Sequence, residues 1–93
     1  MEQDNSIFIG TKPFMNYVTA VVIQFTTENA QKVLIRARGK YISRAVDVAE
    51  ITTKKFLQEK IEVKTVKINT EDFQNDEGKE VQVSTIEIVL EKI

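Results

Sequence analysis

The sequence contains no cysteine and no histidine. Without cysteine the chain has neither a disulfide nor a thiolate metal ligand. Without histidine it lacks the commonest general base, the commonest neutral metal ligand and the side chain that titrates near neutral pH. These absences argue against an enzyme and against a metal site, so we expect no catalytic residues and no cofactor.

Long hydrophobic runs are also missing. The longest apolar run has four residues, Ala20 to Ile23, whereas a helix that spans a membrane needs about 20. Residues 1–7 lack the basic start and the apolar stretch of a secretory signal. We therefore expect a soluble, cytoplasmic protein with no membrane partner. The chain has 93 residues, of which 42% are hydrophobic, and this fits a single domain over residues 1–93. Because the core of such a domain is small, dimerisation would add to its stability.

Charge is abundant, and it is segregated along the chain. The 13 basic and 14 acidic residues leave a formal net charge of −1. Residues 1–31 carry about −2, residues 32–67 about +6 and residues 68–93 about −5. Residues 31–44 contain no acid and five cations: Lys32, Arg36, Arg38, Lys40 and Arg44. Such a segment can present a positive face to a phosphate backbone even when the total charge is near zero.

Hydrophobic periodicity predicts the order β-α-β-α-β-β. Short β-branched or alternating runs indicate strands, and apolar residues at offsets of three and four indicate helices. We expect an α/β sandwich with one mixed four-stranded sheet and two helices. The predicted elements are a buried strand at 6–10, a helix at 13–27, a strand at 32–37, a helix at 43–57, and strands at 61–68 and 81–90.

Two interruptions of the pattern bear on the last two strands. The apolar phase changes between Val63 and Val66, and again between Val83 and Ile86, which predicts a bulge or twist at each place. The segment 71–80 is polar, with a turn signal at residues 75–78. It predicts the tip of a hairpin arm that covers residues 69–82.

Three blocks of the sequence resemble the Alba family of archaeal chromatin proteins. Residues 9–18 (IGTKPFMNYV) resemble the first family signature, residues 36–51 (RARGKYISRAVDVAEI) the second, and residues 83–90 (VSTIEIVL) the closing strand. The resemblance runs in order over residues 7–92 without large gaps. It implies the β-α-β-α-β-β fold and a homodimer that binds double-stranded DNA and RNA with little sequence preference.

The resemblance also implies a setting and a set of residues. It implies chromatin packing and RNA stabilisation at the chromosome, with higher assemblies or a second Alba-like paralogue as further partners. It places Phe56 at contacts between dimers. Carried over by motif, the nucleic-acid surface comprises Lys12, Asn16, Tyr17, Arg36, Arg38, Gly39, Lys40, Arg44 and Lys79.

Each of these residues also has a simpler interpretation. Lys12 and Lys40 fit solvated surface lysines, Tyr17 fits helix packing, and Phe56 fits the core. The two strand arginines fit ion pairs with acids of the second helix, namely Asp47 and Glu50. Those two acids equally fit partners of Arg44 or Lys54, and the pair Lys54–Lys55 fits a solvated helix edge.

Two departures from the family pattern concern binding strength. Thr11 stands where family members often have the first of two successive lysines. In the arm, Lys79 fills a position that is basic in the family, but five acids surround it: Glu71, Asp72, Asp76, Glu77 and Glu80. Acidic side chains repel a polyanion, so we expect this chain to bind nucleic acid more weakly than a family member with a basic arm. We expect the central basic surface to contribute most of the binding. The acidic arm also fits an alternative function, a protein-interaction subunit of an RNA-processing ribonucleoprotein.

Overall fold

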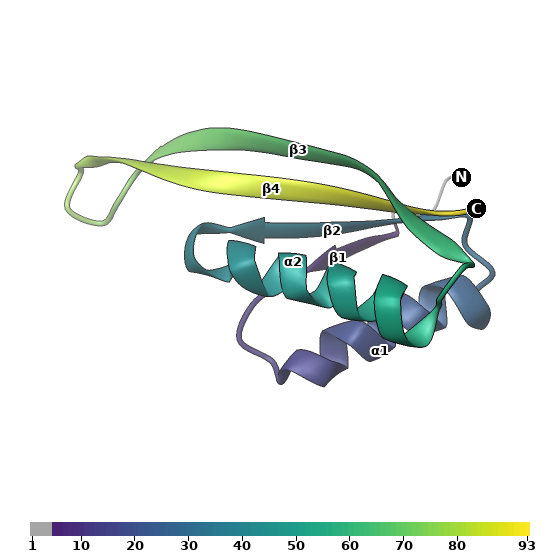
Figure 1. Ribbon diagram of the computed structural model, residues 1–93. Coiled ribbons are helices and arrows are strands. Elements are labelled where there is room, and N and C mark those ends of the chain that lie inside the picture. The colour runs from purple at the N-terminus through teal and green to yellow at the C-terminus, as the bar shows by residue number, and fades with distance from the viewer. Residues whose placement is uncertain (1–4) are drawn as a thin grey trace.

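The computed structural model describes residues 5–93 and has the α/β architecture that the periodicity predicts (Figure 1). Its helices and strands follow the expected order, and most ends lie within a few residues of the expected ones. In chain order they are β1 (Ser6–Phe8), α1 (Phe14–Thr26), β2 (Lys32–Arg38), the 3₁₀ turn η1 (Gly39–Tyr41), α2 (Ile42–Ile51), the π-helical turn η2 (Thr52–Phe56), β3 (Ile61–Gln74) and β4 (Glu80–Lys92).

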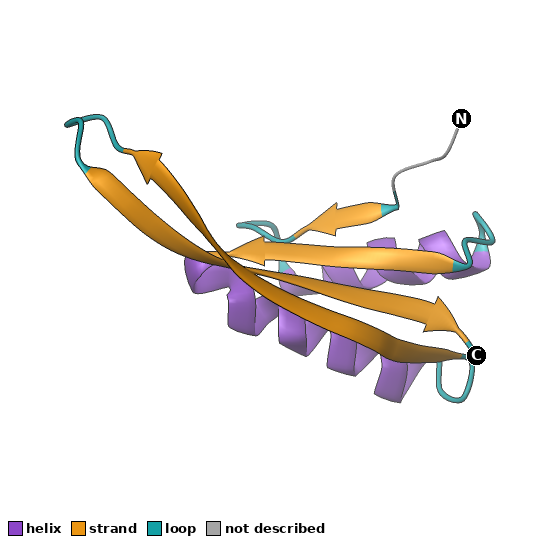
Figure 2. Cartoon of the chain, turned by 90° about the horizontal axis from the view of Figure 1, so that it is seen from above, coloured by secondary structure: helices purple, strands orange, loops and turns teal. Residues whose placement is uncertain are grey.

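One mixed sheet and two helices form two layers. The strand order is β1-β2-β4-β3, with β1 parallel to β2 and the other pairs antiparallel. Both helices lie against the same face of the sheet (Figures 1 and 2). The opposite face, which we call the open face, has no layer of described residues over it. No helix within residues 5–93 is long and apolar enough to cross a membrane.

The core lies between the helices and the sheet. Alternate residues of β2 and β4 point toward the helices, and α1 and α2 bury one stripe each, as the 2- and 3.6-residue periods require. Apolar burial of this kind supplies most of the folding free energy. The largest side chains that are less than 2% exposed are Val18, Val21, Val33, Ile35, Val48, Thr52 and Leu90.

The predicted bulge in β3 is confirmed, and the one in β4 is wrong. The pairing of β3 with β4 shifts between Val63 and Thr65. The extra residue lets both Val63 and Val66 point to the helix side, since they pair with Leu90 and Ile88. In β4 the register is continuous, and the change of apolar phase has another cause. Val81 and Val83 lie on the open face, whereas Ile86 and Ile88 lie on the helix face.

The interpretation of residues 6–10 as a buried strand is also wrong in part. β1 has three residues, it is an edge strand, and Phe8 points to the open face with 66% of its surface exposed. Ile9, just after the strand, is 6% exposed in the core, and Ile7 packs against the core while partly buried.

The arm is a continuous antiparallel ribbon that projects beyond the body of the molecule (Figure 2). Strand pairing runs from Asn69↔Thr85 out to Gln74↔Glu80. The loop closes at Asn75, whose carbonyl accepts from the Gly78 amide at 2.9 Å, with Gly78 at φ +78°. This is a short hairpin loop in which glycine adopts the left-handed conformation. It confirms the turn expected at residues 75–78.

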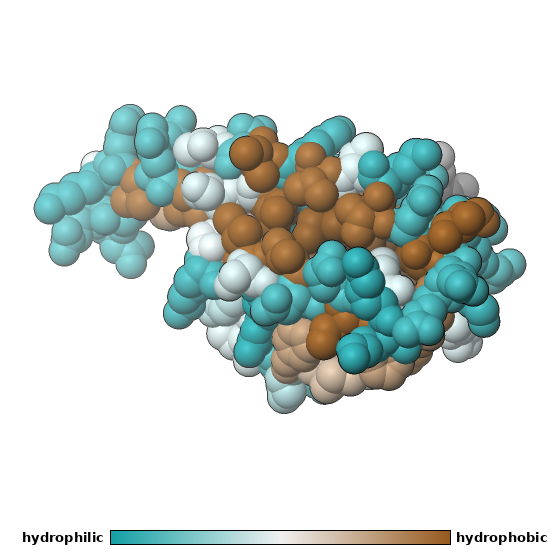
Figure 3. Space-filling view, viewed as in Figure 1, coloured by the Kyte–Doolittle hydropathy of each residue, from teal (hydrophilic) through white to brown (hydrophobic). Residues whose placement is uncertain are grey.

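Apolar side chains gather on the surface between the β3–β4 ribbon and α2 (Figure 3). They include Val63, Val66 and Ile68 of β3, which are 40%, 54% and 81% exposed. All three point to the helix side of the sheet, but β3 is the edge strand beyond α2, so the helices leave them uncovered.

Candidate nucleic-acid interface

The first strand-to-helix junction carries Lys12 on a loop that two side chains hold in place. The amides of Gly10 and Lys12 each donate to the Tyr17 hydroxyl oxygen at 2.9 Å. Arg44 Nη1 donates to the carbonyls of Gly10 and Lys12 at 3.0 and 2.8 Å. The loop therefore has a defined shape, and it holds the Lys12 backbone against α2 while the side chain stays exposed.

Tyr17 and Arg44 thus act within the protein. Tyr17 is 7% exposed, so its ring packs in the core, as the simpler interpretation expected, and cannot take a base on its face. The Arg44 guanidinium directs Nη1 to two backbone carbonyls and forms no ion pair with Asp47 or another acid within residues 5–93. Both residues hold the loop in place through hydrogen bonds to its backbone.

The second junction joins β2 to α2 through η1. Gly39 has φ +53°, a left-handed conformation that costs other residues about 1–2 kcal/mol. The turn presents Lys40 to solvent, with its Nζ 5.4 Å from the centroid of the Tyr41 ring. A cation over an aromatic face gains about 0.5–1 kcal/mol when exposed, so Tyr41 restrains Lys40 without neutralising it.

The two junctions meet at one surface. A depression of about 550 Å³ is lined by Thr11 and Phe14 from the first junction and, from the second, by Lys40, Tyr41, Ser43, Arg44 and Asp47. Neither α1 nor α2 has an acid in its first turn, and neither has a side-chain cap. Their partial positive ends are therefore not offset by a carboxylate there. We call the exposed parts of residues 10–16 and 39–44 the junction surface.

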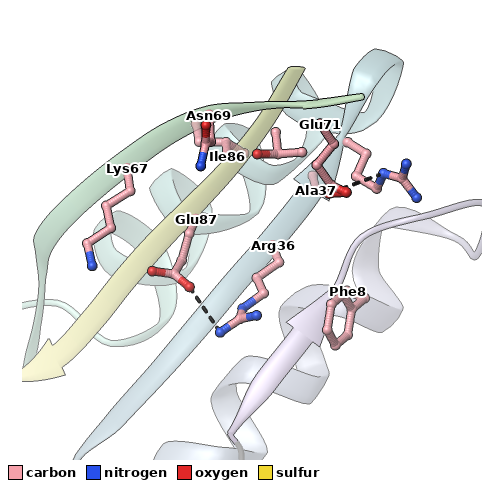
Figure 4. A pocket seen from close by; sticks show the side chains of 10 residues that line it. Phe8, Arg36, Ala37, Lys67, Asn69, Glu71, Ile86 and Glu87 are labelled. Atoms are coloured by element: carbon pink, nitrogen blue, oxygen red, sulfur yellow. Dashed lines mark ion pairs between the residues drawn. The ribbon is translucent and has the colours of Figure 1, made fainter. Parts of the chain in front are cut away.

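Arg36 and Arg38 lie on the open face and have carboxylate partners (Figure 4). Arg36 Nη2 lies 3.0 Å from Glu87 Oε1, and Arg38 Nε lies 3.8 Å from Glu71 Oε1. The expected pairing with acids of the second helix is wrong, because the helices cover the other face of the sheet. Two of the five cations expected at the central basic surface therefore lie beside carboxylates of β3 and β4.

The two glutamates were missed at the sequence level, although a signal for one was present. Glu87 alternates with Ile86 and Ile88 in the closing strand, and a period of two places it opposite the core. That is the face on which Arg36 and Arg38 lie. Glu71 was assigned to a hairpin tip, and only the long register of β3 with β4 brings it beside Arg38.

The remaining predicted residues lie apart from one another. Asn16 is exposed in the first turn of α1, four residues after Lys12 in the chain. Lys79 is at the arm tip, 4.0 Å from Glu77 and 77% exposed. Phe56 ends η2 with 52% of its surface exposed, so it is not a core residue. The prediction that Glu50 pairs with Lys54 is confirmed at 3.7 Å.

Among the cations of the junction surface, Lys12 and Lys40 are exposed, whereas Arg44 is half-buried. No ion pair within 4.0 Å joins either lysine to a carboxylate of residues 5–93. The same residues contain no group of three or more acids that could hold a metal ion. The arrangement suits anion binding by exposed ammonium groups beside two helix N-termini.

The comparisons with known proteins agree with this geometry. The family model described as Alba matches residues 5–70. The DNA/RNA-binding protein Alba of Methanococcus maripaludis is 52% identical over 89 residues, which cover 96% of this chain and 99% of that protein. DNA/RNA-binding protein Alba 1 of Archaeoglobus fulgidus is 53% identical, covering 96% and 97%. The solved structure of Alba from Thermoplasma volcanium superposes with a TM-score of 0.85 at 52% identity, covering 94% and 99%.

Proposed function

Because this chain belongs to the Alba family, we propose that it binds DNA and RNA as a dimer, with little dependence on base sequence. The relatives from Methanococcus maripaludis and Archaeoglobus fulgidus are described as DNA/RNA-binding proteins. The observation that carries the proposal is the junction surface, where the loops that carry Lys12 and Lys40 are brought together from distant segments by Arg44 and by a shared depression. Neither lysine has a carboxylate partner among the described residues.

Sequence neutrality follows from the kind of contact that this surface offers. Lysine ammonium groups and the amides of helix N-termini bind phosphate oxygens, which are the same at every base pair. The exposed Asn16 lies beside them and can donate to a sugar or phosphate oxygen. Binding of this kind supports chromosome association, chromatin packing and protection of RNA.

The dimer is supported by the uncovered apolar surface. Val63, Val66 and Ile68 form a row along the helix side of β3, and Ile42 of α2 lines a depression together with Ile68. Burying such a row against a copy of itself removes apolar area from water at about 25 cal/mol per Å². A two-fold interface pairs the same patch on both chains. Phe56 lies outside this row and remains available for contacts between dimers.

The acidic arm limits the strength of binding. Five acids and one lysine lie between residues 71 and 80, and all of them are exposed. Repulsion from a polyanion acts within about 8–10 Å at ordinary ionic strength. Binding therefore relies on the two junction surfaces of the dimer more than on the arms.

Fluorescence anisotropy with labelled nucleic acids tests the proposal. We expect two 20-base-pair duplexes of unrelated sequence to bind with affinities within about threefold of each other, and a structured RNA to bind as well. Lys12→Ala should weaken all three to a similar degree, whereas Lys55→Ala, which removes an exposed lysine outside the junction surface, should change little. A strong preference for one duplex contradicts neutrality, and absence of binding contradicts the function.

A further inference from the structure

The open face of the sheet carries two exposed phenylalanines, each with an arginine over its ring. Phe8 is 66% exposed and Phe73 is 41% exposed. The guanidinium carbon of Arg36 lies 5.9 Å from the Phe8 centroid, and that of Arg38 lies 5.6 Å from the Phe73 centroid. The core does not use these rings, since the helices lie on the other face. Their surfaces are available to a ligand.

A groove of about 310 Å³ runs across this face beside Phe8. Phe8 of β1 forms one wall, and Lys67 and Asn69 of β3 form the opposite one (Figure 4). The ion pairs Arg36–Glu87 and Arg38–Glu71 lie between them. The groove thus combines an aromatic face, planar guanidinium groups and hydrogen-bonding side chains at its edges.

Charge decides what kind of ligand fits. Three cations and two carboxylates line the groove, which leaves about +1, and both arginines are already paired. A duplex binds through many phosphates and hides the faces of its bases, so this groove offers it little. An unpaired base presents its face to phenylalanine and arginine and its edge to amide and carboxylate groups.

Resting on the nucleic-acid binding proposed above, we propose that this groove is a second nucleic-acid site that takes unpaired bases of single-stranded RNA or DNA. Phe8 is the main stacking platform. Arg38 stands two residues after Arg36 on β2, about 6–7 Å along the strand, and its guanidinium lies near Phe73, a further exposed ring outside the groove on the β3 side. Asn69 and the paired carboxylates meet the base edges.

The position of the groove relative to the junction surface favours the same ligand. β1 and β2 are parallel, so Phe8 and Arg38 both lie near strand ends that lead into Lys12 and Lys40. A strand whose phosphates reach the lysines can place its next unpaired bases on the open face. The apolar row proposed for the dimer lies on the other side of the sheet, which leaves the groove accessible in both subunits.

The test compares a single strand with a duplex. The full chain is titrated into a 12-nucleotide adenine RNA containing one 2-aminopurine, and into a 20-base-pair DNA duplex. Base–aromatic stacking is worth about 1–3 kcal/mol, so Phe8→Ala should weaken single-strand binding by about 5- to 100-fold and abolish the fluorescence change of 2-aminopurine. Phe8→Tyr keeps the ring and should stay within about twofold of wild type. Duplex binding by Phe8→Ala should also stay within twofold.

Ile23→Ala is the matched control, because it truncates an exposed apolar side chain on the helix layer, 43% exposed. Phe73→Ala is a second variant, for which a smaller loss is expected. If Phe8→Ala binds the single strand as Ile23→Ala does, the inference is wrong, and a groove that takes a protein segment gives this same result. Failure of the proposed function appears separately, as loss of duplex binding by the wild-type chain.

Discussion

Gly39 sits where the chain leaves β2 and delivers Lys40 to the junction surface, and its left-handed conformation makes a residue-level prediction. A Cβ at this position meets only Val83 Cγ1 at 3.7 Å, an ordinary contact, while φ is +53°. The cost of Gly39→Ala therefore comes from the backbone. We expect the free energy of unfolding to fall by about 1–2 kcal/mol, as measured by urea denaturation.

Gly10→Ala is the control for this prediction. It flanks the same surface, its added Cβ would lie 3.5 Å from the Tyr17 hydroxyl, and its φ is outside the left-handed region. A compatible Gly→Ala change restricts the unfolded chain and stabilises by about 0.4–1 kcal/mol. Equal destabilisation by the two variants contradicts the backbone explanation for Gly39.

The availability of each cation is the part of the site that the sequence could not reveal. The segment from Lys32 to Arg44 marks a basic region correctly as a count of charges. Whether an exposed arginine has a carboxylate partner depends on its neighbours in adjacent strands. The partner of Arg38, Glu71, is 33 positions away in the chain, so the local sequence does not reveal the pair. Nor does a single sequence show that Nη1 of Arg44 donates to the backbone carbonyls of Gly10 and Lys12.

At the scale of elements, order and type could be predicted because the periods of two and 3.6 are local properties. The bulge in β3 was predictable for the same reason, since Val63 and Val66 must both reach an apolar side. The exposure of Phe8 in β1 could not be predicted, because a three-residue apolar run looks the same in an edge strand as in a central strand. In β4 the phase change reflects two apolar faces, which only the neighbouring layers can distinguish.

The arm gives the prediction at this scale. The variant Asp76→Asn, Glu77→Gln and Glu80→Gln removes three charges near the tip while keeping side-chain size. One repulsion at about 4 Å in water is worth about 1 kcal/mol, so duplex affinity should rise by about fivefold or more at low salt, and the gain should shrink as salt is added. Fluorescence anisotropy over a range of salt concentrations measures both effects.

Glu28→Gln with Glu59→Gln is a suitable control for the arm variant. Both acids are exposed, and they lie in connections outside the arm and the junction surface. Their neutralisation should change affinity little. An arm variant that binds no more tightly than this control shows that the tip does not approach nucleic acid.

At the scale of the whole molecule, charged and apolar side chains are segregated, so the surface is divided into three regions of different chemistry. The junction surface holds the available lysines, the helix side of β3 holds the uncovered apolar row, and the open face holds the aromatic groove. The sequence predicted the first face from its charge. The sequence suggested a dimer only through chain size and family resemblance. It could not identify the interface, because which apolar residues remain uncovered depends on how far α2 extends along the sheet.

The dimer is tested by a charge in the apolar row. Ile68 is 81% exposed, so Ile68→Glu should leave the monomer folded but place a carboxylate in the interface, where an unpaired charge is costly. We expect wild type at twice the 10.7 kDa chain mass and the variant at the single mass in sedimentation equilibrium. Ile23→Glu, the same change on α1, should remain dimeric. A variant that still dimerises places the interface elsewhere.

The salt dependence of duplex binding tests the central claim most directly, namely that Lys12 and Lys40 are the cations that meet phosphate. With four such contacts in a dimer, log affinity should fall against log salt with a slope of about −3.6, on the rule of roughly 0.9 per contact. The double variant Lys12→Ala/Lys40→Ala should bring the slope close to zero, and Lys54→Ala/Lys55→Ala should leave it as in wild type. A slope that survives loss of Lys12 and Lys40 would contradict the account.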